Sequence, residues 1–287
     1  MCLHGGGGLN CSLNRARLVE LADLHDIQKA FVELLSDSGK LVPEGSGTEG
    51  ALLADLTMQL DPRRLQVYTN DLAARRLRLA RSVYPLTMKL LAHDEKQIVR
   101  EFWSGRKSTH YNPICELEVF PQFLAKHSTL SDELPFLEDL AGYEWLRRRV
   151  HTNSEAIRSS LSGKESIGIN SSLVLRRFTY PVHSIAKKVA SGSKGGPAFE
   201  AAEQYLAVYQ DPADRRNLRV QELGRLTFAL LERFTQGKLS GGDLIQESID
   251  WLHRESAQPQ TMEEARTSIQ CLFQDLTGCG ILLRNDQ

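Results

Sequence analysis

The chain has 287 residues, of which 41% are hydrophobic and 25% charged. This composition is typical of a soluble globular protein and excludes a fibrous or disordered chain, and the length suffices for two domains. A protein that binds nucleic acid through phosphate contacts usually carries a basic excess on the binding domain. Here the formal net charge is -1, with 35 Lys and Arg against 36 Asp and Glu, so the charge gives no such indication.

The sequence shows neither a recognisable targeting signal nor a cysteine motif. No run of about 18 apolar residues is present, and the opening MCLHGGGGLNCSLNRAR lacks the apolar stretch of a secretory signal, so we expect a cytoplasmic protein. The five cysteines are odd in number and form no CxxC pair, which favours reduced thiols. We expect Cys271 and Cys279 to be packing residues, because the C-terminal end of a helix disfavours a thiolate.

Helices account for the first half of the sequence. After a flexible start at residues 1–17, an amphipathic stripe predicts a helix from Leu18 to about Ser38. A long helix begins at Asp61 and Pro62. Pro85 bends or ends it near Val83-Tyr84, since proline disfavours helical geometry in the preceding residue. Shorter helices are expected over 95–103, 117–127 and 134–150. Residues 18–150 therefore form an all-helical domain.

The long helix carries a row of arginines on its other faces. Such a row can grip a polyanion, or it can be a solvated face paired with local carboxylates, which the neutral total charge favours. The residues are Arg63, Arg64, Arg75, Arg76, Arg78 and Arg81.

A segment rich in Ser, Gly, Asn and Thr at 151–170, expected to be a linker or an exposed loop, precedes a domain of different character. SSLVLRRFTYPVHSI predicts a strand that stops at Pro181. EQYLAVYQDPADRRNLRVQEL, residues 203–223, alternates with the period of two and predicts a hairpin with the turn DPADRRN. Three amphipathic helices follow, the third capped by Thr261 and ended at Gly278. Three strands and then three helices are the plan of a winged-helix-like domain over 171–287, in a protein that is mainly α with a small antiparallel sheet.

Several short motifs occur in the order of a known bacterial family. RLQVYTNDLAARRLRLARSVYP, FWSGRK and FPQFLAKHSTLSDELPFLEDLAGYEW resemble the N-terminal helical domain of proteins catalogued as DNA-binding and of unknown function. The family usually has Phe-Pro where this chain has Tyr84-Pro85. Its members resemble partner subunits of multinuclear non-heme iron-dependent oxidases. Those oxidases modify cysteine-containing, ribosomally made precursor peptides in pathways to copper-binding peptides and to 3-thiaglutamate.

The second half is similar in element order to the leader-peptide recognition element of such pathways. The resemblance implies that the peptide pairs with the third strand and lies in a groove between that strand and the third helix. An unpaired strand edge offers free N–H and C=O groups to an extended peptide, so the two arguments agree. Carried onto this sequence, the implied peptide-binding residues are Asn217, Leu218, Arg219, Val220, Gln221 and Glu222 on the strand and Arg266, Ile269, Gln270 and Phe273 on the helix. Arg215, Arg216 and Arg219 beside the turn could attract acidic peptide residues.

The expected function is therefore that of a non-catalytic subunit. It binds the leader of a precursor peptide and presents the peptide to the oxidase, which holds the iron, so no cofactor and no metal are expected in this chain. The eight histidines form no HExxH or other metal motif, and there is no phosphate-binding loop or nucleophile elbow. Three alternatives stay open: a winged-helix DNA-binding regulator, a hairpin that only covers the helical core, and an enzyme with a site that the sequence does not reveal.

Overall fold

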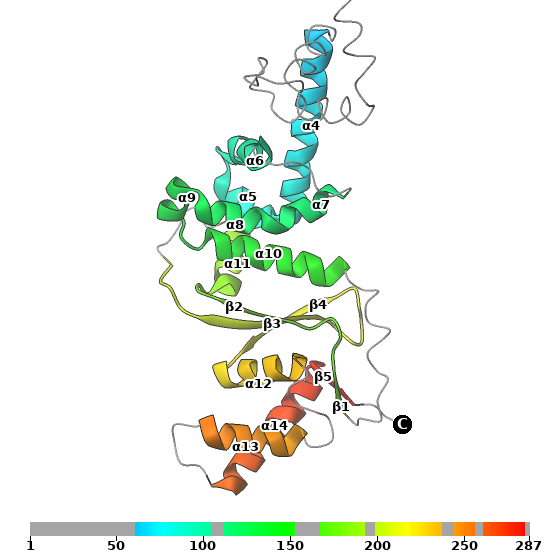
Figure 1. Cartoon of the computed structure of the whole chain (residues 1–287), viewed down its shortest axis with the longest axis vertical. Coiled ribbons are helices and arrows are strands. Elements are labelled where there is room, and N and C mark those ends of the chain that lie inside the picture. Colours follow the sequence, from blue (N-terminus) through cyan, green and yellow to red (C-terminus); the bar gives the residue numbers. More distant parts are fainter. Residues whose placement is uncertain are drawn as a thin grey trace, which may run out of the picture. The chain divides into compact units, whose positions relative to one another are not determined.

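The computed structural model describes residues 61–104, 112–152, 167–192, 199–236, 244–255 and 261–284. Over these residues the protein is mostly helical and contains two small antiparallel sheets, which confirms the expected fold class at that level (Figure 1). The predicted flexible start and the predicted helix from Leu18 lie outside the described residues. None of the helices described is long and apolar enough to cross a membrane.

The contacts of the chain divide it into two compact units. Unit 1 comprises Met1–Ser82 and Leu91–Glu118, and unit 2 comprises Val83–Leu90 and Val119–Gln287. The helices are α4 (Pro62–Val83), α5 (Pro85–Leu91), α6 (Glu95–Ser104), α7 (Pro113–Glu116), α8 (Phe120–Lys126), α9 (Ser128–Glu133), α10 (Leu137–Thr152), α11 (Val182–Ala190), α12 (Arg225–Thr235), α13 (Leu244–Glu255) and α14 (Met262–Gly278).

In unit 1 the long helix α4 begins and ends as its prolines predict. Asp61 caps the start by accepting a hydrogen bond from the Arg63 N–H at 2.9 Å, and Pro85 begins the next helix. Three of the six arginines on α4 have neighbours within the unit. Arg75 pairs with Asp71, Arg81 with Glu95, and the Arg76 guanidinium lies 5.5 Å from the centre of the Trp103 ring. Local pairing therefore accounts for part of the row.

Unit 2 is built around an antiparallel sheet with the strand order β2-β3-β4. The strands are β2 (Val174–Phe178), β3 (Gln204–Gln210) and β4 (Leu218–Leu223). The central strand β3 is buried on both faces, since Leu206, Ala207, Val208 and Tyr209 are all at most 1% exposed. Two further short strands, β1 (Ile167–Ile169) and β5 (Leu282–Arg284), pair with each other in a separate sheet.

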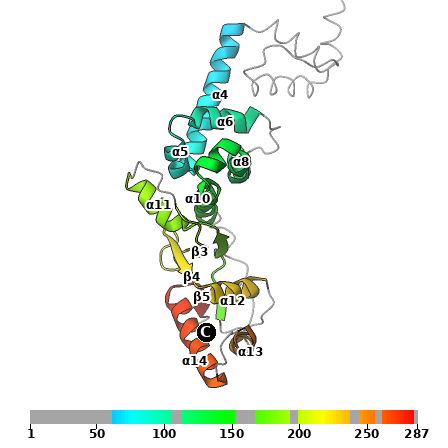
Figure 2. The same ribbon diagram turned by 90° about the vertical axis from the view of Figure 1, so that its left-hand side faces the viewer.

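Helices cover both faces of the three-stranded sheet, as both views show (Figures 1 and 2). On the α10/α11 face, Leu206 and Val208 pack against Leu140 of α10 and Ile185 of α11. On the opposite α12/α14 face, Ala207, Tyr209 and Leu223 pack against the apolar sides of α12, α13 and α14. A fully buried side chain of this size stabilises the fold by about 2 kcal/mol, so each face contributes substantially.

Helix α11 is the main departure from the predicted element order. It lies between β2 and β3, where the sequence predicts only a strand end and a Gly/Ser-rich break. Val182, Ile185, Ala186 and Val189 form a buried stripe at helical spacing. The run is only nine residues long and directly follows the aromatic strand, which concealed its period. Between the short strands β1 and β5 the order is thus strand, helix, strand, strand and three helices, and the winged-helix plan stays a prediction.

The predicted boundary at 151–170 lies within unit 2. Residues 153–166 of that segment are not among those described. Helix α10, which precedes the segment, shares a core with the sheet that follows it: Tyr143 and Leu146 belong to the same buried cluster as Phe178. Glu144 of α10 accepts hydrogen bonds from the Leu86 and Thr87 N–H groups at 2.7 and 3.0 Å, which joins the start of α5 to the same unit.

Candidate functional site

Strand β4 is an edge strand, and the predicted backbone-pairing residues lie on it or directly before it. It pairs on one side with β3, in the register Tyr205↔Leu223 to Gln210↔Leu218. No other described strand pairs with it. Its outer edge is therefore open with respect to the part of the chain that the structure describes.

The turn fixes which backbone groups of β4 point outward. The Asp211 N–H donates to the Asn217 carbonyl at 2.9 Å, so this opposing pair is hydrogen-bonded. Hydrogen-bonded pairs alternate along an antiparallel ladder, so Arg219 and Gln221 bond to β3. The N–H and C=O groups of the intervening residues point away from the sheet, and these residues are Leu218, Val220 and Glu222.

A hydrogen bond on the opposite side of β3 agrees with this assignment. The Gln210 N–H donates to the Ser172 hydroxyl at 2.8 Å, next to the start of β2. The backbone N–H and C=O groups of Gln210 and the other even-numbered residues of β3 thus point toward β2. Those of the odd-numbered residues point toward β4. The same alternation places the outward groups of β2 at Leu175 and Arg177.

The side chains of β4 divide between the two faces of the sheet. Leu218 and Val220 are partly buried against the apolar cluster on the α10/α11 face. Glu222 on the same face is exposed and accepts a hydrogen bond from Gln204 at 3.1 Å. Arg219 and Gln221 lie on the α12/α14 face and are exposed. The strand therefore offers apolar surface on one face and polar surface on the other.

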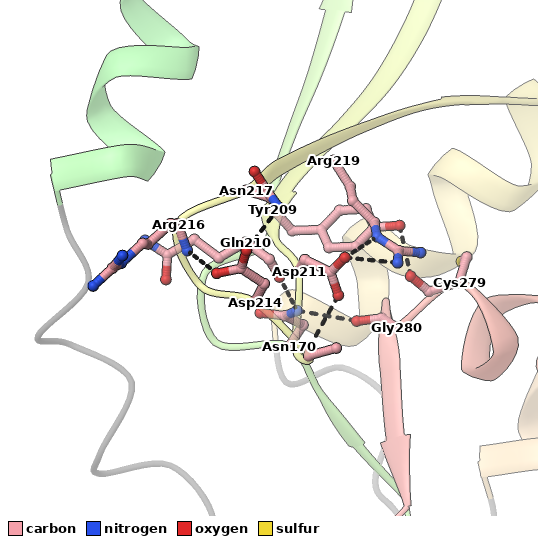
Figure 3. A network of polar contacts seen from close by, with 11 residues as sticks. Asn170, Tyr209, Gln210, Asp211, Asp214, Arg216, Asn217, Arg219, Cys279 and Gly280 are labelled. Atoms are coloured by element: carbon pink, nitrogen blue, oxygen red, sulfur yellow. Dashed lines mark hydrogen bonds and ion pairs between the residues drawn. The ribbon is translucent and has the colours of Figure 1, made fainter.

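Hydrogen bonds order the turn that precedes β4 (Figure 3). The Asp211 carboxylate accepts from the Ala213 N–H at 3.0 Å and from the Arg219 Nε at 2.7 Å. The Ala213 N–H and, after it, the Arg219 guanidinium hold the pKa of Asp211 below its usual value. Asp214 accepts from the Arg216 N–H and from the Asn217 side chain, at 3.1 and 2.8 Å.

Buried polar groups anchor the base of the turn. Asn170, 5% exposed, donates from its amide nitrogen to the carbonyls of Gln210 and Gly280, both at 3.0 Å (Figure 3). The Tyr209 hydroxyl donates to the Cys279 carbonyl at 2.8 Å, and burial raises the pKa of that hydroxyl well above its usual value. These hydrogen bonds join the hairpin to Asn170, which precedes it in the sequence, and to Cys279 and Gly280, which follow it. They give β4 a fixed position.

The other edge of the sheet is partly occupied. The Asp139 carboxylate of α10 accepts hydrogen bonds from the Thr179 and Tyr180 N–H groups at 2.7 and 3.0 Å, directly after β2. A strand added along β2 would compete with this carboxylate at its end. The β4 edge has no such contact among the described residues, so the two edges are not equivalent.

A second polar group lies at the far end of β4 from the turn. The Tyr143 hydroxyl lies 3.1 Å from the His183 Nδ1, and the His183 N–H donates to Gln204, which also contacts Glu222. Burial and then the charge of Lys187 lower the pKa of His183, while Glu222 acts in the opposite sense. The Gln204 side chain therefore links the His183 backbone to the Glu222 carboxylate at the end of the open edge.

The residues predicted on the third helix differ in their exposure. Arg266 and Gln270 are exposed on α14. Ile269 and Phe273 are 2% and 6% exposed and belong to the core of the α12/α14 face. They can support a groove from beneath but offer almost no surface to a peptide. The helix turns its apolar stripe inward, so only the flanking polar positions are accessible.

The described residues hold no group of three or more His, Cys, Asp or Glu side chains suited to a metal ion. The described cysteines are unpaired; Cys279 is half-buried, whereas Cys271 is exposed, contrary to its expected packing role.

No protein-family model matches the chain, and no curated protein matches its sequence.

Sequence reasoning missed residues that fix the hairpin and the β2 end of the sheet. Asn170, Gln210 and Asp139 act through contacts with segments 40 or more residues away, such as Asn170 with Gln210 and Asp139 with Thr179. No local sequence pattern predicts contacts between segments so far apart in the chain. Asn170 lies in a segment predicted as a linker, where polar residues are common and do not indicate a buried structural role.

Proposed function

We propose that this chain binds an extended peptide, which adds as a further strand along the outer edge of β4. The observation that carries the proposal is the row of outward N–H and C=O groups at Leu218, Val220 and Glu222 on a strand that the turn network holds in place. Strand addition satisfies such groups, and the main-chain bonds supply affinity that depends little on sequence.

Following the resemblance described above, the peptide is the leader of a ribosomally made precursor with a cysteine to be modified. The chain is then a non-catalytic partner that presents the precursor to a multinuclear non-heme iron oxidase, as in the pathways to copper-binding peptides or 3-thiaglutamate. This part rests on the resemblance of the sequence motifs, since helix α11 departs from the element order that the resemblance implies. The open edge supplies the physical means of binding.

DNA binding by the third helix has less support. A recognition helix in the major groove carries basic residues that contact phosphates and bases. The exposed residues of α14 include Glu263, Glu264 and Asp275 against Arg266. Such a helix would be repelled by the phosphate backbone.

Substitution of Val220 by proline tests the edge directly. Proline removes one outward N–H but leaves the bonds between β3 and β4, which Arg219 and Gln221 make. Ligands are selected against the wild-type chain from a phage-displayed peptide library, and the best is synthesised with a fluorophore. We expect its affinity, measured by fluorescence anisotropy, to fall at least about tenfold, as for a lost hydrogen bond and a blocked approach.

Three further variants separate the backbone from other effects. Val220→Ala keeps the N–H and should retain most of the affinity, and Arg177→Pro removes an outward N–H from the opposite edge, where binding is not expected. Leu218→Pro repeats the test at a second outward position if Val220→Pro does not fold, as judged by circular dichroism. Unchanged affinity in a folded proline variant of β4 would refute the proposal, as would equal loss in Arg177→Pro.

The oxidase partnership has a separate test. The tagged chain is co-expressed with an iron oxidase and a short cysteine-containing peptide encoded beside it. We expect a complex that contains iron and a mass change on the peptide cysteine; Val220→Pro should abolish the mass change and leave the complex with the oxidase intact. Peptide binding without any oxidase complex would refute the partnership and leave the strand-addition mechanism standing.

A further inference from the structure

The geometry of β4 also specifies which peptide it accepts, an inference that rests on the proposed function. A strand added to the edge places one residue opposite each outward residue of β4. Directly opposed side chains lie on the same face of the sheet, about 5 Å apart, and interact as a pair. The side chains of Leu218, Val220 and Glu222 are therefore the neighbours of every second peptide residue.

Two of these neighbours are apolar and incompletely covered. Leu218 and Val220 pack on the cluster that contains Val182 and Ile185 of α11, and both keep part of their surface exposed. Apolar peptide side chains opposite them would extend this cluster and remove the remaining surface from water. The α10/α11 face thus favours two apolar residues separated by one.

The opposite face makes no comparable demand. Arg219 is engaged by the Asp211 carboxylate through its Nε at 2.7 Å and through a second nitrogen at 2.6 Å. Gln221 is exposed and uncharged. Peptide residues on this face lie beside Arg219, whose charge is balanced by Asp211, and beside the Gln221 amide. Uncharged polar side chains are therefore sufficient at these positions.

Charge differs between the two ends of the edge. At the turn end, Arg215 and Arg216 are exposed, and the nearby Asp214 carboxylate already accepts hydrogen bonds from the turn itself. At the other end, Glu222 is exposed. Complementary charges steer and orient a ligand even where each pair contributes little affinity.

We infer that the ligand is an amphipathic extended segment in which two apolar residues alternate with polar ones. It has an acidic end beside the turn and a basic residue beside Glu222. Its apolar side faces α11, and its polar side faces α12 and α14.

Two capped peptides of identical composition test the alternation. KTVTVTEE can place both valines on the α10/α11 face, whereas KTVVTTEE cannot in any register, because adjacent residues of a strand point to opposite faces. Fluorescence anisotropy should show about fivefold tighter binding of KTVTVTEE, as expected for one good cross-strand pair. Leu218→Ser should reduce this preference. Equal binding of the two peptides, abolished in each case by Val220→Pro, would overturn this inference and leave the strand-addition proposal standing. If neither peptide binds, the inference and the strand-addition proposal are both overturned.

A charge cycle tests the direction. Replacement of both Arg215 and Arg216 by serine should weaken KTVTVTEE about threefold at low salt and leave KTVTVTTT unchanged. The matched control replaces Arg63 and Arg64, an exposed arginine pair on α4, and should change neither affinity. A loss that is equal for both peptides would show that the turn arginines do not recognise an acidic end. Concentration-dependent self-association in sedimentation, abolished by Val220→Pro, would identify a second copy of the chain as the occupant instead.

Discussion

Gly280 illustrates how a single residue holds the hairpin in place. Its φ of +83° lies in the left-handed region, and a Cβ added there would lie 2.7 Å from Cγ of Pro212 in the turn. Its carbonyl accepts the hydrogen bond from Asn170. Only glycine allows the chain after α14 to approach the turn this closely.

Gly280→Ala should lower the free energy of unfolding by about 2 kcal/mol, since it combines backbone strain with a steric clash. Gly192→Ala is the matched control, because Gly192 has a similar φ of +90° and no atom within 4 Å of the added Cβ. It should cost about 1 kcal/mol. Urea denaturation measures both values, and equal losses would mean that Pro212 yields without cost.

Single residues of the site were predictable only in part. The alternation of Leu218, Arg219, Val220 and Gln221 follows from a period of two, and the structure places them on alternate faces as the pattern implies. For Phe273 the sequence could not distinguish a groove from a core, because both select apolar residues at helical spacing. Burial decides that question, and it depends on neighbours far away in the chain.

At the scale of elements, the hairpin depends on its turn, and the turn depends on the Asp211 carboxylate. The pKa of Asp211 is lowered in the folded protein, so its contribution to stability is present above the unfolded carboxyl pKa of about 3.9 and is lost as the pH falls through the folded value. Asp211→Asn removes the charge and weakens the contact with Arg219.

Thermal unfolding of the wild type and of Asp211→Asn should therefore differ at neutral pH, with the wild type more stable. The difference should shrink as the pH is lowered below about 4. Asp132→Asn, at an exposed carboxylate on α9, provides the control for general charge effects. A stability difference that grows in acid would contradict the assigned role of Asp211.

Elements were more predictable than their arrangement. The hairpin bounds, the proline-limited helix α4 and the Thr261 cap of α14 follow from local chemistry, and the structure confirms them. Helix α11 was not predicted, because its nine residues come soon after a strand and are followed by the run SGSKGG. A short helix has too few turns to establish a period against such neighbours.

At the largest scale, the three-stranded sheet of unit 2 is a middle layer between helices. Leu140 and Tyr143 of α10 cover one face, and α12 to α14 cover the other. The sequence could not predict this arrangement, because an amphipathic stripe shows that a helix buries one side and does not show against which partner. With both faces covered, the strand edges are the parts of this sheet where backbone groups can still bind a partner.

Amide hydrogen exchange of the free protein, resolved to single residues by NMR, tests the open edge most directly. The outward amides of Leu218, Val220 and Glu222 should exchange rapidly, whereas those of Arg219 and Gln221, bonded to β3, should be protected. Addition of a bound peptide should protect the first set and leave the second unchanged. Slow exchange at Val220 in the free, monomeric protein would mean that another segment of the chain already occupies the edge, and it would contradict the account.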